Sequence, residues 1–343
     1  MDENPSTTSN RVLDRFCHQY LQLQLKLDYP DGEYLRNSVF QKSIFSRLFQ
    51  EEAIQHPPPK GYQFRVLKEF VKRIEESIQN WDEEELNDDL FEALSLLISS
   101  SIPSDLASAQ EESYVTYSLS LLAEDAAKSP TITLREARNV LAASGTTGLR
   151  TWEAALHFGN YLIKNAPNLV EGKSVLELGA GTGYLSMLCA KHLKASYVLA
   201  TDGSGEVVEG LQTSIYLNDL HTTSKIDGKE LKWGYPLMGG EEPEWNGGRK
   251  VDLVIGADLT YYETGIPPLL STFDNVFELY PNVRIIIAAT IRNEETFRKF
   301  LDKCAVWEFL IDEIDFPMIE TGSQQGPFYE DHVPIKILDI RKG

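Results

Sequence analysis

The stretch Glu177-Leu178-Gly179-Ala180-Gly181-Thr182-Gly183 decides the fold class of this 343-residue chain. It ends the short apolar run Ser174–Leu178 and precedes a helical pattern that begins at Tyr184. Small residues let the backbone come close to a ligand, and the N-terminus of the following helix favours negative charge. We therefore expect a strand, a glycine loop and a helix that together form one side of a binding site.

An acidic residue follows the next predicted strand. Asp202 comes directly after Tyr197–Thr201 and lies 23 residues beyond Gly179. A carboxylate there can accept hydrogen bonds from both hydroxyls of a ribose, at the strand ends where open parallel sheets bind ligands. A dinucleotide site favours the spacing GxGxxG, whereas this loop reads GxGxG and continues with Tyr184. A tight turn without a ligand is the alternative, and the position of Asp202 favours a ligand.

Strands and helices alternate through the C-terminal part of the chain. Such alternation predicts a mostly parallel sheet with helices on both faces. The sequence therefore predicts a Rossmann-like α/β domain over residues 143–343. Residues 231–234 are expected to hold the third strand and the loop after it. The further strands are expected at 251–257, 284–290 and, as an edge or antiparallel strand, 333–340, and the helices at 184–193 and 206–217.

The apolar pattern up to about residue 142 is helical instead. Apolar residues recur every three or four positions, which is typical of helices with one buried face. We expect a helical N-terminal domain over residues 1–142. The predicted helical faces lie within residues 12–27, 40–49, 64–78 and 90–98.

The composition is that of an acidic globular protein. The 32 basic and 52 acidic residues give a net charge of −20, which disfavours binding to nucleic acid or to an anionic membrane and suits a basic protein partner. The three cysteines are far apart, so they predict neither a disulfide framework nor a metal clip. The polar start lacks a signal-peptide pattern, and no apolar run is long enough to span a membrane. We expect a soluble intracellular protein.

Four further residues stand where this fold places ligands. Asp258 and Tyr261 follow the predicted strand 251–257. Trp152 begins a helix after a loop of glycines and threonines, and Trp233 follows the predicted third strand. A turn or helix-cap role for Asp258 and simple packing for the aromatic residues are the alternatives.

These motifs resemble those of a known enzyme family. The pattern Glu-Leu-Gly-x-Gly-x-Gly at residues 177–183 resembles motif I of the seven-strand S-adenosylmethionine-dependent methyltransferases. Asp-x-x-Tyr at 258–261 and Gly-Leu-x-Thr-Trp-Glu-Ala-Ala at 148–155 resemble their lysine-specific group, methyltransferase family 16. The stretches 288–295 and 327–332 resemble the branch of that group that methylates translation elongation factor 2.

The resemblance covers about residues 145–340 and implies a function for the sites above. It implies a protein-lysine N-methyltransferase with S-adenosylmethionine as cofactor, elongation factor 2 as protein substrate and the cytoplasm as location. Asp258 and Tyr261 would line the lysine channel as the catalytic residues, and His332 is a further candidate for shaping the site. The cofactor contacts would come from Trp152, Glu177, Gly179, Ala180, Gly181, Asp202, Trp233 and Ala257.

Other functions stay open at this stage. Asp-x-x-Tyr does not select a substrate, so another protein lysine is one alternative, and a non-catalytic assembly protein that keeps the cofactor fold is a second. A dehydrogenase is disfavoured by the GxGxG spacing, and a small-molecule or nucleic-acid methyltransferase by the missing Asn-Pro-Pro-Tyr signature. The six histidines show no ligand spacing, so we expect no metal. We also expect a monomer.

Overall fold

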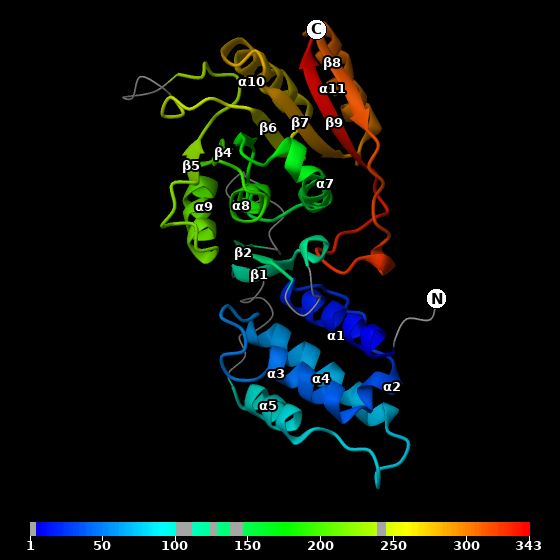
Figure 1. Ribbon diagram of the computed structural model, residues 1–343. Helices are drawn as coiled ribbons and strands as arrows, with labels where there is room; N and C mark the ends of the chain where they lie inside the picture. The colour runs from blue at the N-terminus through cyan, green and yellow to red at the C-terminus, as the bar shows by residue number, and fades with distance from the viewer. Residues whose placement is uncertain (1–4, 101–111, 124–128, 138–146, 239–244) are drawn as a thin grey trace. The chain divides into compact units, whose positions relative to one another are not determined.

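The computed structural model describes residues 5–100, 112–123, 129–137, 147–238 and 245–343. These residues form two compact units. The colours of Figure 1 give the residue number along the chain, so the residues of each unit can be found there. The first unit holds the described residues up to 137 together with Gln325–Phe328. The second holds the described residues from 147 to 324 and Tyr329–Gly343. The boundary expected between residues 142 and 143 lies outside the described residues.

Helices build most of the first unit. Two of them begin at asparagine caps: the Asn37 side chain accepts from the N–H groups of Val39 and Phe40, and the Asn87 side chain from that of Leu90. Their apolar faces meet in one core that contains Phe16, Ile44, Phe70 and Ile74 among other residues. The helices are α1 (Pro5–Leu21), α2 (Gly32–Leu35), α3 (Ser38–Leu48), α4 (Lys60–Ser77) and α5 (Asp88–Ser99).

The first unit also contains a pair of strands that the helical pattern did not predict. β1 (Ser113–Ser118) and β2 (Thr131–Glu136) pair antiparallel, with Val115 opposite Leu134. Alternate residues of each strand are buried, which is the period of a half-buried strand rather than of a helix. The expectation of helix up to residue 142 is therefore wrong for these two segments. A short helical turn, η1 (Ser120–Leu122), follows β1.

A seven-stranded sheet organises the second unit and confirms the α/β fold. Its order is β5-β4-β3-β6-β7-β9-β8 (Figure 1). Neighbours from β5 to β7 are parallel, whereas β9 is antiparallel to both β7 and β8. The strands are β3 (Ser174–Leu178), β4 (Tyr197–Asp202), β5 (Ile226–Glu230), β6 (Leu253–Ala257), β7 (Arg284–Thr290), β8 (Phe309–Ile314) and β9 (Ile335–Lys342).

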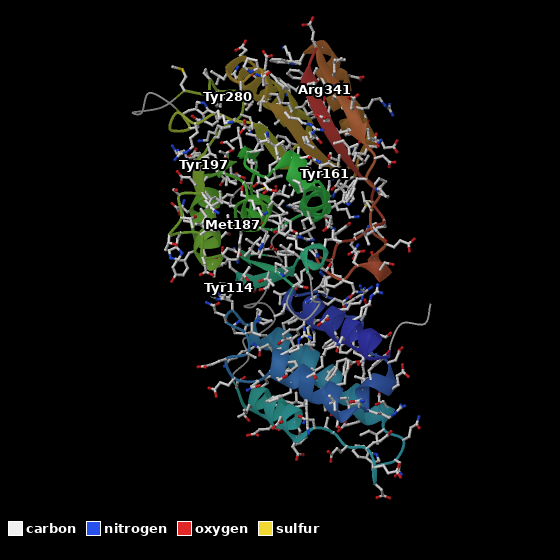
Figure 2. The ribbon with its side chains drawn as sticks, in the orientation of Figure 1. Tyr114, Tyr161, Met187, Tyr197, Tyr280 and Arg341 are labelled. Atoms are coloured by element: carbon white, nitrogen blue, oxygen red, sulfur yellow. The ribbon has the colours of Figure 1, made fainter. Side chains whose placement is uncertain are left out.

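Helices cover both faces of this sheet because successive strand residues point to opposite sides. Leu176 and Leu178 pack in the core that includes α10 and α11, whereas Glu177 reaches Ser186 of α8. Residues of α8 are buried from Tyr184 to Ala190, including Met187, whose position Figure 2 labels. The helices are α7 (Glu153–Leu169), α8 (Tyr184–Lys191), α9 (Gly205–Leu217), α10 (Ile266–Leu279) and α11 (Glu294–Val306), with the short turns η3 (Glu263–Gly265) and η4 (Thr321–Ser323).

The strand order changes direction at β3. The chain moves from β3 to β4 and β5 on one side, and then returns to β6 on the other side of β3. Loops that leave the carboxyl ends of β3 and β6 therefore diverge, and ligands bind at such switch points. The third strand of the sequence analysis is misplaced, because β5 ends at Glu230 and Leu231–Gly234 form the loop after it.

Within the part of the chain that the structure describes, no helix is both long and apolar enough to cross a membrane.

Candidate functional site

A cavity of about 830 Å³ opens at the carboxyl ends of β3, β4 and β6. Its size is that of a site for a ligand as large as a nucleoside derivative. All ten predicted site residues line it, although they come from five different segments of the second unit. They are Trp152, Glu177, Gly179, Ala180, Gly181, Asp202, Trp233, Ala257, Asp258 and Tyr261.

The glycine loop gives the cavity a bare backbone wall. Gly179 has φ +62°, a left-handed conformation that strains other residues. A Cβ atom there would also lie 2.7 Å from Cδ2 of Leu259 and 3.4 Å from the Trp233 ring. Glycine at this position therefore lets the loop, Leu259 and Trp233 come together around the ligand space.

Asp202 is held in place by the backbone of two loops. The Gly181 N–H donates to Oδ2 and the Ser204 N–H to Oδ1, each at 3.1 Å. Burial raises the pKa of the Asp202 carboxyl, and the backbone hydrogen bonds oppose that rise. Each carboxylate oxygen has more than one lone pair, so both can still accept from hydroxyls of a ligand. This arrangement fits a ribose at the end of β4.

Glu177 is a buried acid at the end of β3. Its side chain accepts a hydrogen bond from the Ser186 hydroxyl, and the residue is only 2% exposed. Burial raises the pKa of the Glu177 carboxyl to about 8, and the nearby charge of Asp202 adds to the rise. A cationic ligand group would favour the ionised form. The amino and sulfonium groups of S-adenosylmethionine carry such charge, so the acidic side chains of this cavity fit that cofactor.

Asp258 occupies the opposite part of the cavity with a strained backbone. Its φ is +54°, and its Oδ1 accepts from the Thr290 N–H at 2.8 Å while its Oδ2 accepts from the Thr290 hydroxyl at 3.0 Å. Nη1 of Arg292 lies 3.4 Å from Oδ2. Burial raises the pKa of the Asp258 carboxyl, whereas Arg292 and Thr290 oppose that rise. Two residues thus hold the carboxylate while part of it faces the cavity.

Tyr261 and Tyr262 form the aromatic rim beside Asp258. Their ring centroids lie 4.7 Å apart, and Tyr261 is 54% exposed. The Tyr262 ring packs over Gly265, where a Cβ atom would overlap it. An exposed ring at the mouth of a cavity is placed to contact an incoming side chain rather than to fill a core.

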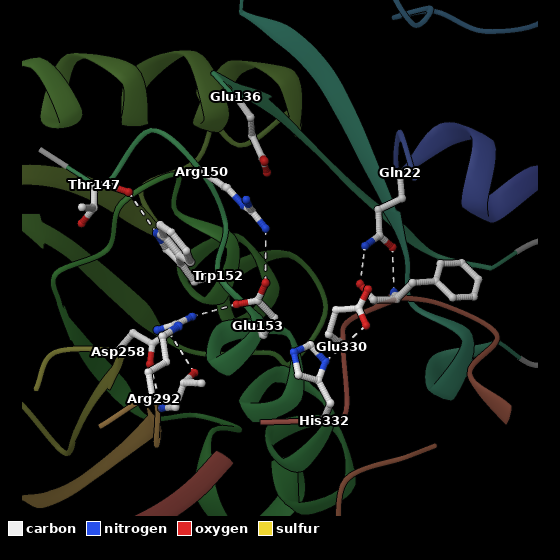
Figure 3. A network of polar contacts seen from close by, with 12 residues as sticks. Gln22, Glu136, Thr147, Arg150, Trp152, Glu153, Asp258, Arg292, Glu330 and His332 are labelled. Carbon is white, nitrogen blue, oxygen red and sulfur yellow. Dashed lines mark hydrogen bonds and ion pairs between the residues drawn. The ribbon is translucent and has the colours of Figure 1, made fainter. Parts of the chain in front are cut away.

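Trp152 stands at the N-terminus of α7 between two arginines (Figure 3). Its Nε1–H donates to the Thr147 carbonyl at 3.0 Å. The guanidinium carbons of Arg150 and Arg292 lie 4.9 and 5.0 Å from the ring centre, within the range of a cation–π contact. Glu153 accepts from both arginines, so tryptophan, carboxylate and arginines form one network.

The sequence analysis missed the residues that support Asp258. Thr290, Arg292 and Glu153 were not named, although the stretch 288–295 and the stretch 148–155 were singled out as family-like. His332 is not among the cavity-lining residues; it is exposed and lies 3.5 Å from Glu330. Among the described residues, no group of three or more histidine, cysteine, aspartate or glutamate side chains could hold a metal ion.

Comparisons with known proteins point to one enzyme family. A model of the family described as lysine methyltransferase matches residues 130–306. Protein-lysine N-methyltransferase EFM3 of Chaetomium thermophilum is 49% identical, over 99% of this chain and 98% of its own length. EFM3 of Saccharomyces cerevisiae is 35% identical over 50% of this chain and 53% of its own length. Protein-lysine N-methyltransferase EEF2KMT of Homo sapiens is 26% identical over 96% and 92%.

Proposed function

The chain belongs to the lysine methyltransferase family, and we propose that it methylates a lysine of translation elongation factor 2. It is a protein-lysine N-methyltransferase, and its cofactor is S-adenosylmethionine. The proposed substrate is supported by the motifs at 288–295 and 327–332 and by the similarity to EEF2KMT over 96% of this chain. A translation factor as substrate would also place the reaction in the cytoplasm.

The observation that carries the proposed mechanism is the pairing of two acidic sites across one cavity. Glu177 and Asp202 lie with the glycine loop, whereas Asp258 and Tyr261 lie beside it on the loop after β6. We assign Asp202 to the ribose hydroxyls and Glu177 to the cationic end of the cofactor. Trp233 and Gly179 would enclose the cofactor, together with Trp152, Ala180, Gly181 and Ala257.

The second pair would receive the lysine. When bound, S-adenosylmethionine supplies a methyl group on a sulfonium sulfur, which is already activated toward an amine. The protein then has to position its reactants and to favour the neutral amine. Asp258 would attract the lysine ammonium and orient its nitrogen, while Tyr261 walls the channel. A lysine ammonium has a pKa of about 10.4 in water, and entry into a partly apolar channel lowers it, so a proton can leave to water. The lone pair would then form the nitrogen–methyl bond as the sulfur–methyl bond breaks.

The substrate is tested by incubating the purified protein with tritiated S-adenosylmethionine and a lysate that lacks the enzyme. We expect one labelled band at the size of elongation factor 2, with the label on a single lysine by mass spectrometry. Purified elongation factor 2 should be labelled in the same way. A labelled band of another protein would overturn the proposed substrate while leaving the enzyme class intact.

Two variants separate the two halves of the site. Asp202→Asn should weaken S-adenosylmethionine binding by about tenfold to a hundredfold in calorimetry, because hydrogen bonds to a charged group contribute about 1.5–3 kcal/mol. Asp258→Asn should keep cofactor binding and lose methyl transfer. Asp219→Asn is the matched control, because Asp219 is an exposed aspartate with φ +60°, close to the +54° of Asp258. Turnover that survives Asp258→Asn would make Asp258 a turn residue only.

A further inference from the structure

We propose that Arg292 pairs with the Asp258 carboxylate before the substrate binds. The ammonium group of the incoming lysine then displaces Arg292 from that carboxylate. The inference rests on the function proposed above for Asp258. It adds a positioning residue that holds the carboxylate ready before substrate arrives and that competes with the substrate for it. Figure 3 shows the network of Asp258, Arg292, Glu153, Trp152 and Arg150 on which the inference depends.

Arg292 has one strong and one weak anionic partner. Its Nη2 lies 2.9 Å from Oε2 of Glu153, whereas its Nη1 lies 3.4 Å from Oδ2 of Asp258. The first distance is that of a charge-assisted hydrogen bond and the second is at the limit of hydrogen bonding. The Trp152 ring also faces the guanidinium, at 5.0 Å. Arg292 can therefore leave Asp258 without leaving its other two partners.

The two carboxylate oxygens of Asp258 have different partners. Thr290 donates to both oxygens, but only Oδ2 also faces a cation. The Asp258 side chain is 9% exposed, and that of Arg292 is 42% exposed. Arg292 is therefore the more exposed partner of this pair, and it lies on the side of Asp258 from which solvent and a protein side chain would approach. A lysine ammonium that reached Oδ2 would replace the guanidinium with a cation of the same charge.

The charges around Asp258 come from several elements. Arg292 follows β7, Glu153 begins α7 beside Arg150, and Tyr261 follows β6 in the loop of Asp258 itself. Arg292 lowers the pKa of the Asp258 carboxyl, whereas burial and the Glu153 charge raise it. Without Arg292, the buried Asp258 carboxylate would keep its hydrogen bonds from Thr290 but would lose this compensating charge beside the like charge of Glu153. The cation thus favours the ionised form of Asp258 until a substrate cation takes over that role.

Glu153 is the second carboxylate partner of Arg292. Its two oxygens are divided, since Oε1 lies 3.2 Å from Nη2 of Arg150 and Oε2 binds Arg292. Removal of Arg292 therefore leaves Glu153 paired with Arg150, and the start of α7 keeps its acidic residue. Removal of the Glu153 charge has the opposite effect, because Arg292 then has Asp258 as its remaining carboxylate in this network. The two changes should move the enzyme in opposite directions.

The test is the pH dependence of kcat/KM for the methylated protein substrate, with the full chain. Arg292→Met should shift the acid limb to higher pH by about one unit, so that the loss approaches about tenfold at a pH well below the wild-type midpoint. Near pH 9, chosen to lie above the acid limb of both proteins, KM should be about twofold lower than in the wild type because a competing cation is gone. Arg292→Lys should restore the wild-type acid limb. Arg298→Met, an exposed arginine of α11, is the matched control.

Glu153→Gln supplies the reciprocal result. Its acid limb should move to lower pH, and its KM near pH 9 should rise, because Arg292 then binds Asp258 more firmly. The melting temperature and the S-adenosylmethionine affinity, read separately, show that each variant is folded and loaded. An unmoved acid limb in Arg292→Met, or a raised KM near pH 9, would overturn the inference. Full activity of Asp258→Asn would instead overturn the function proposed for Asp258, so the two failures are distinguishable.

Discussion

At the scale of single residues, the site depends on acids that the fold removes from water. Glu177 and Asp258 lie at the ends of neighbouring strands, and burial raises the pKa of both carboxyls. Desolvation disfavours the charged form of an acid, and a nearby cation favours it. Each of these carboxylates is therefore stabilised in its ionised form by a cationic partner. Asp258 already has Arg292 beside it. Glu177 has a hydroxyl partner in Ser186, and its proposed cationic partner is the bound cofactor.

Glu177→Gln tests the cost of that burial. The Glu177 pKa rises from 4.5 to about 8, so the folded chain binds more protons than the unfolded chain between these values. The free energy of unfolding of the wild type should therefore fall as pH rises from about 5 to 8, by roughly 3–5 kcal/mol relative to Glu177→Gln. Urea unfolding at both pH values without cofactor measures the difference, and the exposed Glu206→Gln is the control. Parallel pH curves for the wild type and Glu177→Gln would contradict the burial argument.

The motifs and the family resemblance predicted ten of the residues that line the cavity, but not the residues that support them. Asp202 and Asp258 could be found because each follows a recognisable buried strand. Glu153 and Arg292 are 139 residues apart, and only the fold brings their side chains together. A charged residue in a loop has many possible partners in a chain with 84 charged residues from 32 basic and 52 acidic ones. Sequence patterns therefore indicate the ligand-facing residues better than the residues that hold them.

At the scale of elements, the loop between β6 and α10 is the proposed substrate side of the site. It carries Asp258, Tyr261 and Tyr262, and it ends in η3 at Gly265. The Tyr262 ring packs on Gly265, so the position of the aromatic rim depends on a residue without a side chain. The Gly265 backbone, at φ −81°, would itself accept alanine. The steric contact with the ring is thus the constraint there.

Gly265→Ala should displace the aromatic rim while leaving the cofactor side unchanged. The added methyl group meets the Tyr262 ring, which in turn packs against Tyr261. We expect KM for the protein substrate to rise by about threefold to tenfold, since misplaced positioning groups weaken productive binding. Cofactor affinity by calorimetry should stay within error. Gly210→Ala in α9, where a Cβ atom has open space, is the control; a loss of cofactor affinity in Gly265→Ala alone would contradict this assignment.

Elements with a strong buried pattern were predicted better than edge elements. β3, β4 and β7 are buried on both faces and are mostly apolar in sequence. β5 has the sequence Ile-Asp-Gly-Lys-Glu, pairs only with β4 and contains one buried residue, so the apolar signal pointed to the loop after it. β1 and β2 were missed because they form a two-stranded pair inside an otherwise helical region. Strands at an edge carry too few buried residues to mark their own bounds.

At the scale of the whole molecule, the first unit is built from two separate stretches of the chain. Residues 325–328 belong to the first unit, whereas the residues on either side of them belong to the second. The returning segment is held by side chains of α1 and of the residue that follows it. Nδ1 of His18 and the Gln325 carbonyl oxygen lie 2.8 Å apart, and Gln22 contacts Phe328 through both ends of its amide. A fragment that stops before this segment would lack part of the first unit.

Gln22→Ala should weaken the first unit in the full chain. The Gln22 Nε2–H donates to the Phe328 carbonyl at 2.6 Å, and its Oε1 accepts from the Phe328 N–H at 2.8 Å, both in buried surroundings. Alanine would leave a buried donor and a buried acceptor without this partner, at a cost of about 1–3 kcal/mol for each. Urea unfolding followed by the fluorescence of Trp81, the described tryptophan of the first unit, measures the loss.

Two further variants make that measurement decisive. Gln22→Glu keeps the acceptor but, once ionised, has no proton to donate to the Phe328 carbonyl, so its deficit should grow as pH rises above about 4.3, the usual pKa of glutamate. Gln79→Ala removes an exposed glutamine from the same unit and should change the free energy of unfolding by less than about 0.5 kcal/mol. Equal stability of Gln22→Ala and Gln79→Ala would mean that the returning segment adds nothing to the first unit. A selective loss in Gln22→Ala would mean that this unit gains its full stability only after the part of the second unit up to residue 324 has been synthesised, because residues 325–328 follow that part in the chain.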